Sequence, residues 1–150
     1  MTLKSIDEIL DFAIKNEEEA AKFYTGLAGK MDKPAMKKVF LDFAKEEEGH
    51  KKKLLHVKEG KTLEPVKDKI MDLKIADYLV EEEPRPDLDY QGALILAMKQ
   101  EKAAFKLYSD LAEAAEDEGV RNTFLALAQE EAKHKLRFET EYDEHILSGN

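Results

Sequence analysis

Cysteine is absent from the 150-residue sequence. Its absence excludes thiolate metal ligands and thiol nucleophiles, and it agrees with a reducing compartment. No apolar run approaches the length of about 18 residues that a membrane-spanning helix needs. The first residues lack the basic segment and the apolar core of a signal peptide. We therefore expect a cytoplasmic protein without a membrane-embedded segment.

Positive charge is also scarce. The chain has 24 Lys and Arg against 33 Asp and Glu, which gives a net charge of −9. A surface of this sign repels nucleic acid and anionic lipid, so neither is expected as a partner. The sequence is rich instead in both charged (38%) and hydrophobic (43%) residues. Because the apolar residues recur at three- and four-residue steps, we predict a helical chain in which residues 1–150 form one domain.

Glycine and proline number only 7 and 4, and their positions divide the chain. A capping box at Ser5–Glu8 predicts the start of a first helix, which ends near Gly29. Pro34 begins a second helix, and Gly60 ends it. These two helices form a predicted hairpin over residues 3–60.

Residues 61–88 hold three of the four prolines, and we predict a long connection there with a short helix over residues 72–80. Asp89 has the position of an N-cap for a third helix. Gly119 is expected to break the chain before a fourth helix, which extends to about Leu147.

Two helices, a connection and two more helices make a simple layout. The predicted hairpins over residues 3–60 and 89–148 are joined by a crossover at 61–88. No strand pattern competes with the helical one. This layout predicts an all-α fold, a four-helix bundle with one long crossover.

The chain also contains an internal repeat. A shift of 84 residues aligns 13–28 with 97–112, where eight of sixteen positions are identical. The same shift aligns 40–51 with 124–135, where seven of twelve are identical. Because one offset serves both pairs, the two hairpins look like copies related by a pseudo-twofold axis.

Six polar residues occupy matched positions of this repeat within apolar stripes. They are Glu17, Glu47, His50, Glu101, Glu131 and His134. A carboxylate in a bundle core is costly unless it is paired or bound to metal, and four together need a counter-charge. Two divalent cations balance four glutamates, and neutral histidine adds a nitrogen ligand without charge. The pattern predicts a di-metal site, against the alternative of a metal-free bundle whose acids face water.

The register of the acidic ligand within each Glu-x-x-His motif is ambiguous. Glu46 and Glu130 also match across the repeat, and each lies four residues before its histidine, so spacing alone permits either pair. Glu47 and Glu131 are preferred because they continue the apolar steps of their helices and share a face with the histidines three residues later.

Tyr24 and Tyr108 each lie two turns after a predicted glutamate ligand. They are either core aromatics or hydroxyl donors to a ligand carboxylate. His56 and His145 are expected on the surface. His56 has no partner in the repeat and lies on another face of the helix than His50, and His145 lies about three turns, or roughly 16 Å, from His134.

These motifs resemble a known family. The pattern A-x-x-x-E-x-x-A-x-x-x-Y, present twice, and the two E-x-x-H motifs are similar to the rubrerythrin-type branch of the ferritin-like superfamily over nearly the whole chain. The resemblance implies a non-haem di-iron centre with the six residues above as ligands, where Mn or Zn could replace Fe. It also implies that Glu47 and Glu131 bridge the two ions, and that the protein is a homodimer.

The resemblance further implies a reaction with hydrogen peroxide or dioxygen, in which ferrous iron supplies the electrons. Rubrerythrin proper carries a rubredoxin domain with four cysteines, which this chain lacks, so a separate electron donor such as a rubredoxin-like protein is expected. An additional family Glu is replaced by Ala104, so the ligand exchange that depends on it is not carried over. We expect an oxidoreductase of the peroxidase or ferroxidase type, with an iron carrier or storage protein as the alternative.

Overall fold

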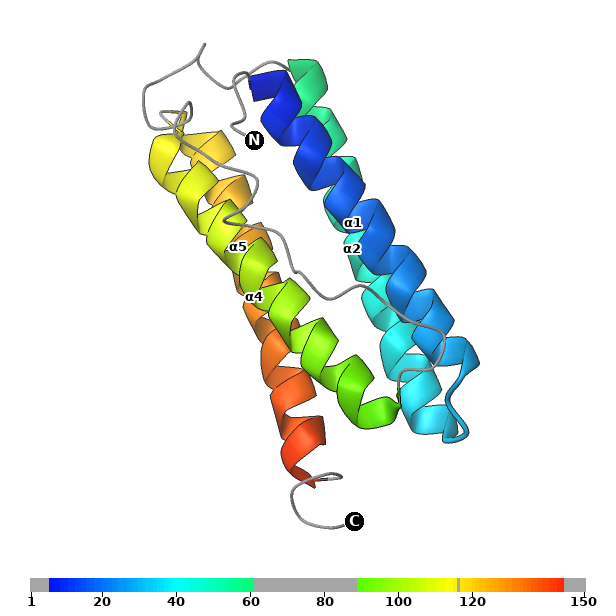
Figure 1. Ribbon diagram of the computed structural model, residues 1–150. Coiled ribbons are helices and arrows are strands. Elements are labelled where there is room, and N and C mark those ends of the chain that lie inside the picture. The colour runs from blue at the N-terminus through cyan, green and yellow to red at the C-terminus, as the bar shows by residue number, and fades with distance from the viewer. Residues whose placement is uncertain (1–5, 61–88, 116, 145–150) are drawn as a thin grey trace.

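The structure is a computed structural model that describes residues 6–60, 89–115 and 117–144. In these ranges it has four α-helices and no strand: α1 (Ile6–Gly29), α2 (Pro34–Gly60), α4 (Tyr90–Ala114) and α5 (Glu118–Tyr142). Figure 1 shows two antiparallel pairs, α1 with α2 and α4 with α5, packed side by side. The predicted all-α four-helix bundle is confirmed.

The order of the helices requires a connection along the bundle. α2 ends at the end of the bundle where α1 begins, whereas α4 starts at the opposite end (Figure 1). The chain must therefore span the length of the bundle between Gly60 and Asp89. The predicted crossover at 61–88 with its short helix, the cap at Ser5 and the helix end near Leu147 lie outside the described residues.

The break between the last two helices differs from the prediction. α4 ends at Ala114, and α5 begins at Glu118, after the N-cap Asp117. The Asp117 carboxylate accepts a hydrogen bond from the Val120 backbone N–H at 2.9 Å. Gly119 thus lies inside the first turn of α5, and the predicted break there is wrong, because an N-cap aspartate marks a helix start more strongly than a glycine does.

Asp89 is the N-cap of α4, as predicted. Its side chain accepts a hydrogen bond from the Gly92 backbone N–H at 2.7 Å. The two caps of the second hairpin therefore satisfy helix N-termini with carboxylates, which also suits the positive end of each helix dipole.

The core consists of two apolar clusters, and each draws residues from all four helices. The first includes Ile9, Leu54, Leu107, Leu111, Phe124 and Leu127. The second includes Leu27, Phe40, Leu94, Ala97 and Phe138. Along α1 the clusters end at Ile14 and resume at Tyr24. Between them lies a short segment in which the buried side chains are Glu17 and Ala21.

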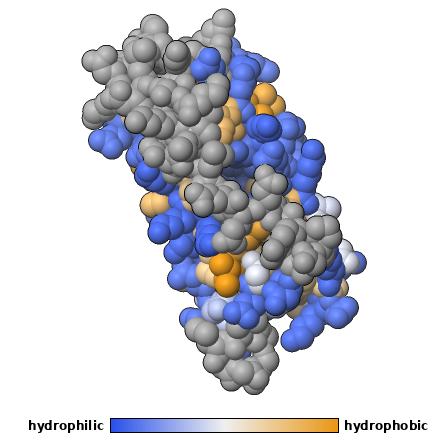
Figure 2. Space-filling view, viewed as in Figure 1, coloured by the Kyte–Doolittle hydropathy of each residue, from blue (hydrophilic) through white to orange (hydrophobic). Residues whose placement is uncertain are grey.

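On the face shown in Figure 2, the described residues are mostly hydrophilic, with small hydrophobic patches. The large hydrophobic side chains with the most exposure are Leu41, Leu55, Phe105, Leu125 and Leu136. No helix among the described residues has the length and apolarity needed to cross a membrane.

Candidate metal centre

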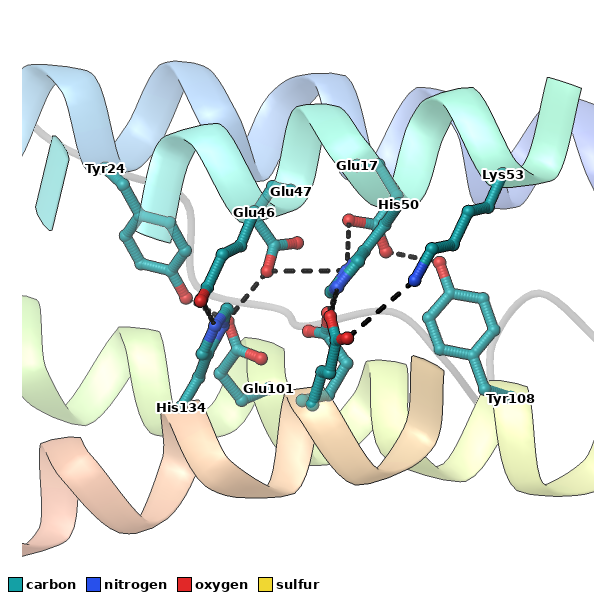
Figure 3. Close-up of polar contacts among 11 residues, drawn as sticks. Glu17, Tyr24, Glu46, Glu47, His50, Lys53, Glu101, Tyr108 and His134 are labelled. Carbon is teal, nitrogen blue, oxygen red and sulfur yellow. Dashed lines mark hydrogen bonds and ion pairs between the residues drawn. The ribbon is translucent and has the colours of Figure 1, made fainter. Parts of the chain in front are cut away.

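The six predicted ligands converge between the two apolar clusters. α1 contributes Glu17, α2 contributes Glu47 and His50, α4 contributes Glu101, and α5 contributes Glu131 and His134. Each is at most 3% exposed. Figure 3 shows side chains from both hairpins pointing toward one another across the bundle. Periodicity and repeat therefore located a real cluster of buried acids and imidazoles.

The cluster divides into two overlapping groups of four. One consists of Glu17, Glu47, His50 and Glu131, and the other of Glu47, Glu101, Glu131 and His134. In each group one potential ligand atom per residue lies within 4.8 Å of all the others. Glu47 and Glu131 belong to both groups, so these two carboxylates stand in the middle of the arrangement.

The imidazoles face the cluster through Nδ1. His50 Nδ1 lies 2.7 Å from Glu131 Oε1 and 3.4 Å from Glu17 Oε2. His134 Nδ1 lies 3.0 Å from Glu47 Oε1 and 3.6 Å from Glu101 Oε1. The Nδ1 atom of each histidine is thus close to one carboxylate of its own hairpin and to one carboxylate of the opposite hairpin.

Each of the six residues has one buried polar atom without a hydrogen-bond partner. These atoms are Glu17 Oε2, Glu47 Oε1, His50 Nδ1, Glu101 Oε2, Glu131 Oε1 and His134 Nδ1. The 2.7 Å contact between His50 and Glu131 lacks hydrogen-bond geometry. An unsatisfied buried polar group costs about 1–3 kcal/mol, so six together need a common partner. The residues fit a pair of cations, which carboxylate oxygens and imidazole nitrogens can ligate directly.

The charges of the cluster perturb one another. Burial raises the pKa of Glu131, and the neighbouring charges of Glu101, Glu47 and Glu17 raise it further. Burial, followed by Glu17 and Glu101, likewise raises the pKa of Glu47. Without a cation, the two central carboxyls therefore tend to hold protons, because four adjacent carboxylates repel one another.

Glu17 behaves differently. Burial opposes its ionisation, but contacts with Glu47, His50 and the Tyr108 hydroxyl outweigh burial and lower its pKa. Around the histidines, burial favours the neutral ring, but neighbouring carboxylates raise the pKa of both His50 and His134. Bound cations would take over the role of these protons, since a ligand carboxyl or imidazole nitrogen must be deprotonated to coordinate.

Tyr24 and Tyr108 are both core aromatics and hydrogen-bond donors. Tyr24 stacks on Phe40 with ring centroids 6.4 Å apart, and its hydroxyl donates to Glu101 Oε1. The Tyr108 hydroxyl donates to Glu17 Oε1. Burial, with the nearby glutamate charges, raises the pKa of both phenols well above the ordinary value, so both stay protonated donors.

Each tyrosine serves a glutamate of the other hairpin. The sequence suggested a hydroxyl donor but not its recipient, because helical spacing defines a face and not the residue that lies opposite.

Glu46 and Glu130 lie outside the converging atoms. Their side chains are 51% and 37% exposed. Glu46 contacts Nε2 of His134, and Glu130 contacts Nε2 of His50, on the edge of each ring away from the cluster. The preferred register, with Glu47 and Glu131 facing the centre, is the one that the structure places among the candidate ligand atoms.

Two histidines and one buried acid are not among the candidate ligands. His56 is exposed, and His145 lies outside the described residues. Glu141, only 3% exposed, accepts a hydrogen bond from the Tyr90 hydroxyl at 2.7 Å. Matching the two halves of the repeat does not single out this buried acid, because the matching position is Val57.

Comparison with known proteins agrees with this fold. A protein from Thermotoga maritima, described in its crystal structure as ferritin-like and diiron-carboxylate, superposes with a TM-score of 0.76. The match covers 96% of this chain and 97% of that one at 24% identity, which shows a shared fold. No curated protein sequence matches the chain. The model of the Rubrerythrin family matches residues 8–142, and the chain therefore belongs to the rubrerythrin family.

Proposed function

We propose that the protein binds two iron ions and is a non-haem di-iron oxidoreductase, which reduces hydrogen peroxide or dioxygen with electrons from ferrous iron. The observation that carries the proposal is the set of six buried, unpartnered ligand atoms in two groups. A donor set of four carboxylates and two imidazoles suits Fe or Mn, and Zn can also occupy it. Membership of the rubrerythrin family supports the choice of iron.

The proposed ligands divide by group. Glu17 and His50 would hold one ion, and Glu101 and His134 the other. Glu47 and Glu131, which both groups contain, would be shared. Four glutamates and two divalent cations sum to zero net charge, which removes the cost of burying the carboxylates together.

Two bound ferrous ions would supply the two electrons that convert hydrogen peroxide to two waters, or dioxygen to peroxide, with uptake of two protons. The protein's own part is to position and to shield. Tyr24 and Tyr108 hold one oxygen of Glu101 and Glu17, which leaves the other oxygen of each carboxylate without a hydrogen-bond partner. The two apolar clusters exclude water along the bundle on either side.

The decisive experiment is metal analysis of anaerobically purified protein, followed by ferrous loading and stopped-flow oxidation with hydrogen peroxide and with dioxygen. We expect about two irons per chain and oxidation faster than that of free ferrous ion. Fewer ions per chain, with no acceleration by either oxidant, would contradict the proposal.

A second measurement separates turnover from storage or transport. With a reductant present, an oxidoreductase should consume many equivalents of peroxide per chain while its iron stays bound. Since the chain has no cysteine, we propose a separate electron donor, such as a rubredoxin-like protein. We also propose that the working assembly is a homodimer. Oxidation that ends after one turnover, with release or accumulation of iron, would indicate a carrier or storage protein.

A further inference from the structure

Glu46 and Glu130 form a reciprocal pair of contacts between the hairpins. Glu46 on α2 contacts His134 on α5, and Glu130 on α5 contacts His50 on α2. In both cases the carboxylate meets Nε2, while Nδ1 of the same ring faces the candidate metal centre. Figure 3 shows Glu46 reaching across to His134 from the opposite helix. The duplication therefore preserved a contact that neither hairpin can make alone.

The chemistry of imidazole gives these contacts a specific consequence. An ionised carboxylate is only an acceptor, so a hydrogen bond to it requires a proton on Nε2. The neutral ring that carries this proton has its lone pair on Nδ1, which is the form that ligates a metal through Nδ1. A carboxylate at the outer nitrogen therefore selects the tautomer and fixes the rotation of the ring.

The two rings are restrained to different extents. His134 stacks on Phe43, with centroids 4.1 Å apart and planes inclined by 19°. The residue that matches Phe43 in the repeat is Leu127, which offers His50 no aromatic face. Glu46 and Glu130 both line an open pocket of about 410 Å³, but Glu130 also lies 3.8 Å from the Lys53 ammonium. The hydrogen bond of His50 should therefore be the more important of the two.

We propose that Glu46 and Glu130 are positioning residues, which hold His134 and His50 with Nδ1 directed at the metal centre. This inference rests on the proposed metal binding, but it assigns a role to two residues that are not themselves ligands. The acids act across the hairpin boundary, so each hairpin sets the ligand geometry of the other.

Zn²⁺ affinity of the full chain is the first test, measured by competition with a chelator. Glu46→Ala and Glu130→Ala should each weaken binding by about 10–100-fold, the usual effect of losing such a partner, with the larger loss for Glu130→Ala. Glu46→Gln and Glu130→Gln should retain most of the affinity, because an amide carbonyl still accepts from Nε2–H. Glu48→Ala, an exposed residue of the same helix, is the matched control and should bind Zn²⁺ normally.

The second test resolves the individual rings by NMR of protein with ¹⁵N-labelled histidine. The Nε2–H proton of each ring should be protected from exchange in the parent protein. Glu46→Ala should remove the protection at His134 but not at His50, and Glu130→Ala should do the reverse. A loss of stability alone would affect both rings together, so circular dichroism and the reciprocal ring serve as internal controls.

The outcomes are distinct. Unchanged affinity and protection in the Ala variants, or Gln variants as weak as Ala variants, would overturn the positioning role while leaving the metal site intact. If the parent chain bound no Zn²⁺ and no Fe²⁺, the proposed function would fail instead. In that case the exchange measurement on metal-free protein would still decide whether the carboxylates hold the rings.

Discussion

The two hairpins agree at the polar residues of the candidate metal centre and differ at many of the positions around it. The buried glutamates, histidines and tyrosines of α1 and α2 have identical counterparts in α4 and α5 at the constant offset of 84 residues. Two residues further out the match disappears: Glu18 and Glu19 correspond to Lys102 and Ala103. An interior position in one hairpin is constrained by its contacts with the other, whereas an exposed side chain has no such partner. The comparison therefore sets the candidate ligands apart from Glu18 and Glu19, the neighbouring acids that have no acidic counterpart.

The largest expected effect concerns the carboxylates that both groups share. Glu47→Ala and Glu131→Ala should each abolish binding of two ions, whereas Glu17→Ala should weaken mainly one. Removal of a direct ligand should lower the metal affinity by more than the roughly 100-fold that removal of a hydrogen-bond partner of a ligand can cause. Metal content and Zn²⁺ titration check this expectation. If Glu47→Ala bound two ions with normal affinity, the two ions would not share Glu47 as a ligand.

Core packing should be nearly equivalent in the two halves. Phe40 and Phe124 occupy matched positions, and both are fully buried, one in each apolar cluster. Truncation of either to Ala should lower the free energy of unfolding by about 3–5 kcal/mol, as measured by urea denaturation. Leu125→Ala, at a half-exposed position beside Phe124, should cost much less. A large difference between the two Phe variants would mean that one cluster collapses around the cavity and the other does not.

The tyrosine hydrogen bonds offer a finer comparison. Tyr24→Phe and Tyr108→Phe keep the buried ring but remove the donor to Glu101 and Glu17. Each should lower the free energy of unfolding of the metal-free protein by about 1.5–3 kcal/mol, the range for hydrogen bonds to charged groups. Tyr142→Phe, at a half-exposed position, provides a control. If both buried variants unfolded like the parent, the hydroxyls would contribute orientation but little stability.

Helix capping is a place where the halves differ and can be made alike. Asp117 caps α5, but the matching position before α2 is Lys33, whose backbone carbonyl accepts the first helical hydrogen bond. Asp117→Ala should cost about 0.5–2 kcal/mol, and Lys33→Asp should gain a similar amount. Thermal or urea unfolding measures both. If Lys33→Asp left the stability unchanged, the start of α2 would gain nothing from a cap, because Pro34 already suits the first helical position.

Much of the fold and most of the centre followed from the sequence because they depend on helical periodicity and on the repeat. A three-residue step places Glu47 and His50 on one face, and the 84-residue offset identifies their partners without any structure. The sequence left open what depends on how the hairpins meet. The recipient of each tyrosine hydroxyl and the role of Glu46 are set by a residue on the opposite helix, which no local spacing can identify.

Two smaller differences have a different origin. The helix break falls before Gly119 because Asp117 caps α5, and aspartate is a residue type that favours the N-cap. Matching the two halves does not identify Glu141, because a repeat reveals only the residues that both halves retain. A buried acid with a valine as its counterpart can be recognised only from its contact with Tyr90.

The cross-hairpin contacts also bear on how such a chain could arise. Each hairpin contains a glutamate, a Glu-x-x-His motif and a tyrosine, and it lacks only what the other supplies. Two identical copies of one hairpin, associated about a twofold axis, would present the same arrangement of six residues, with every contact made twice. Fusion of the copies into one chain removed that obligation. His134 could then acquire an aromatic neighbour, Phe43, while His50 kept a leucine, an inequality that a strictly symmetric pair could never maintain.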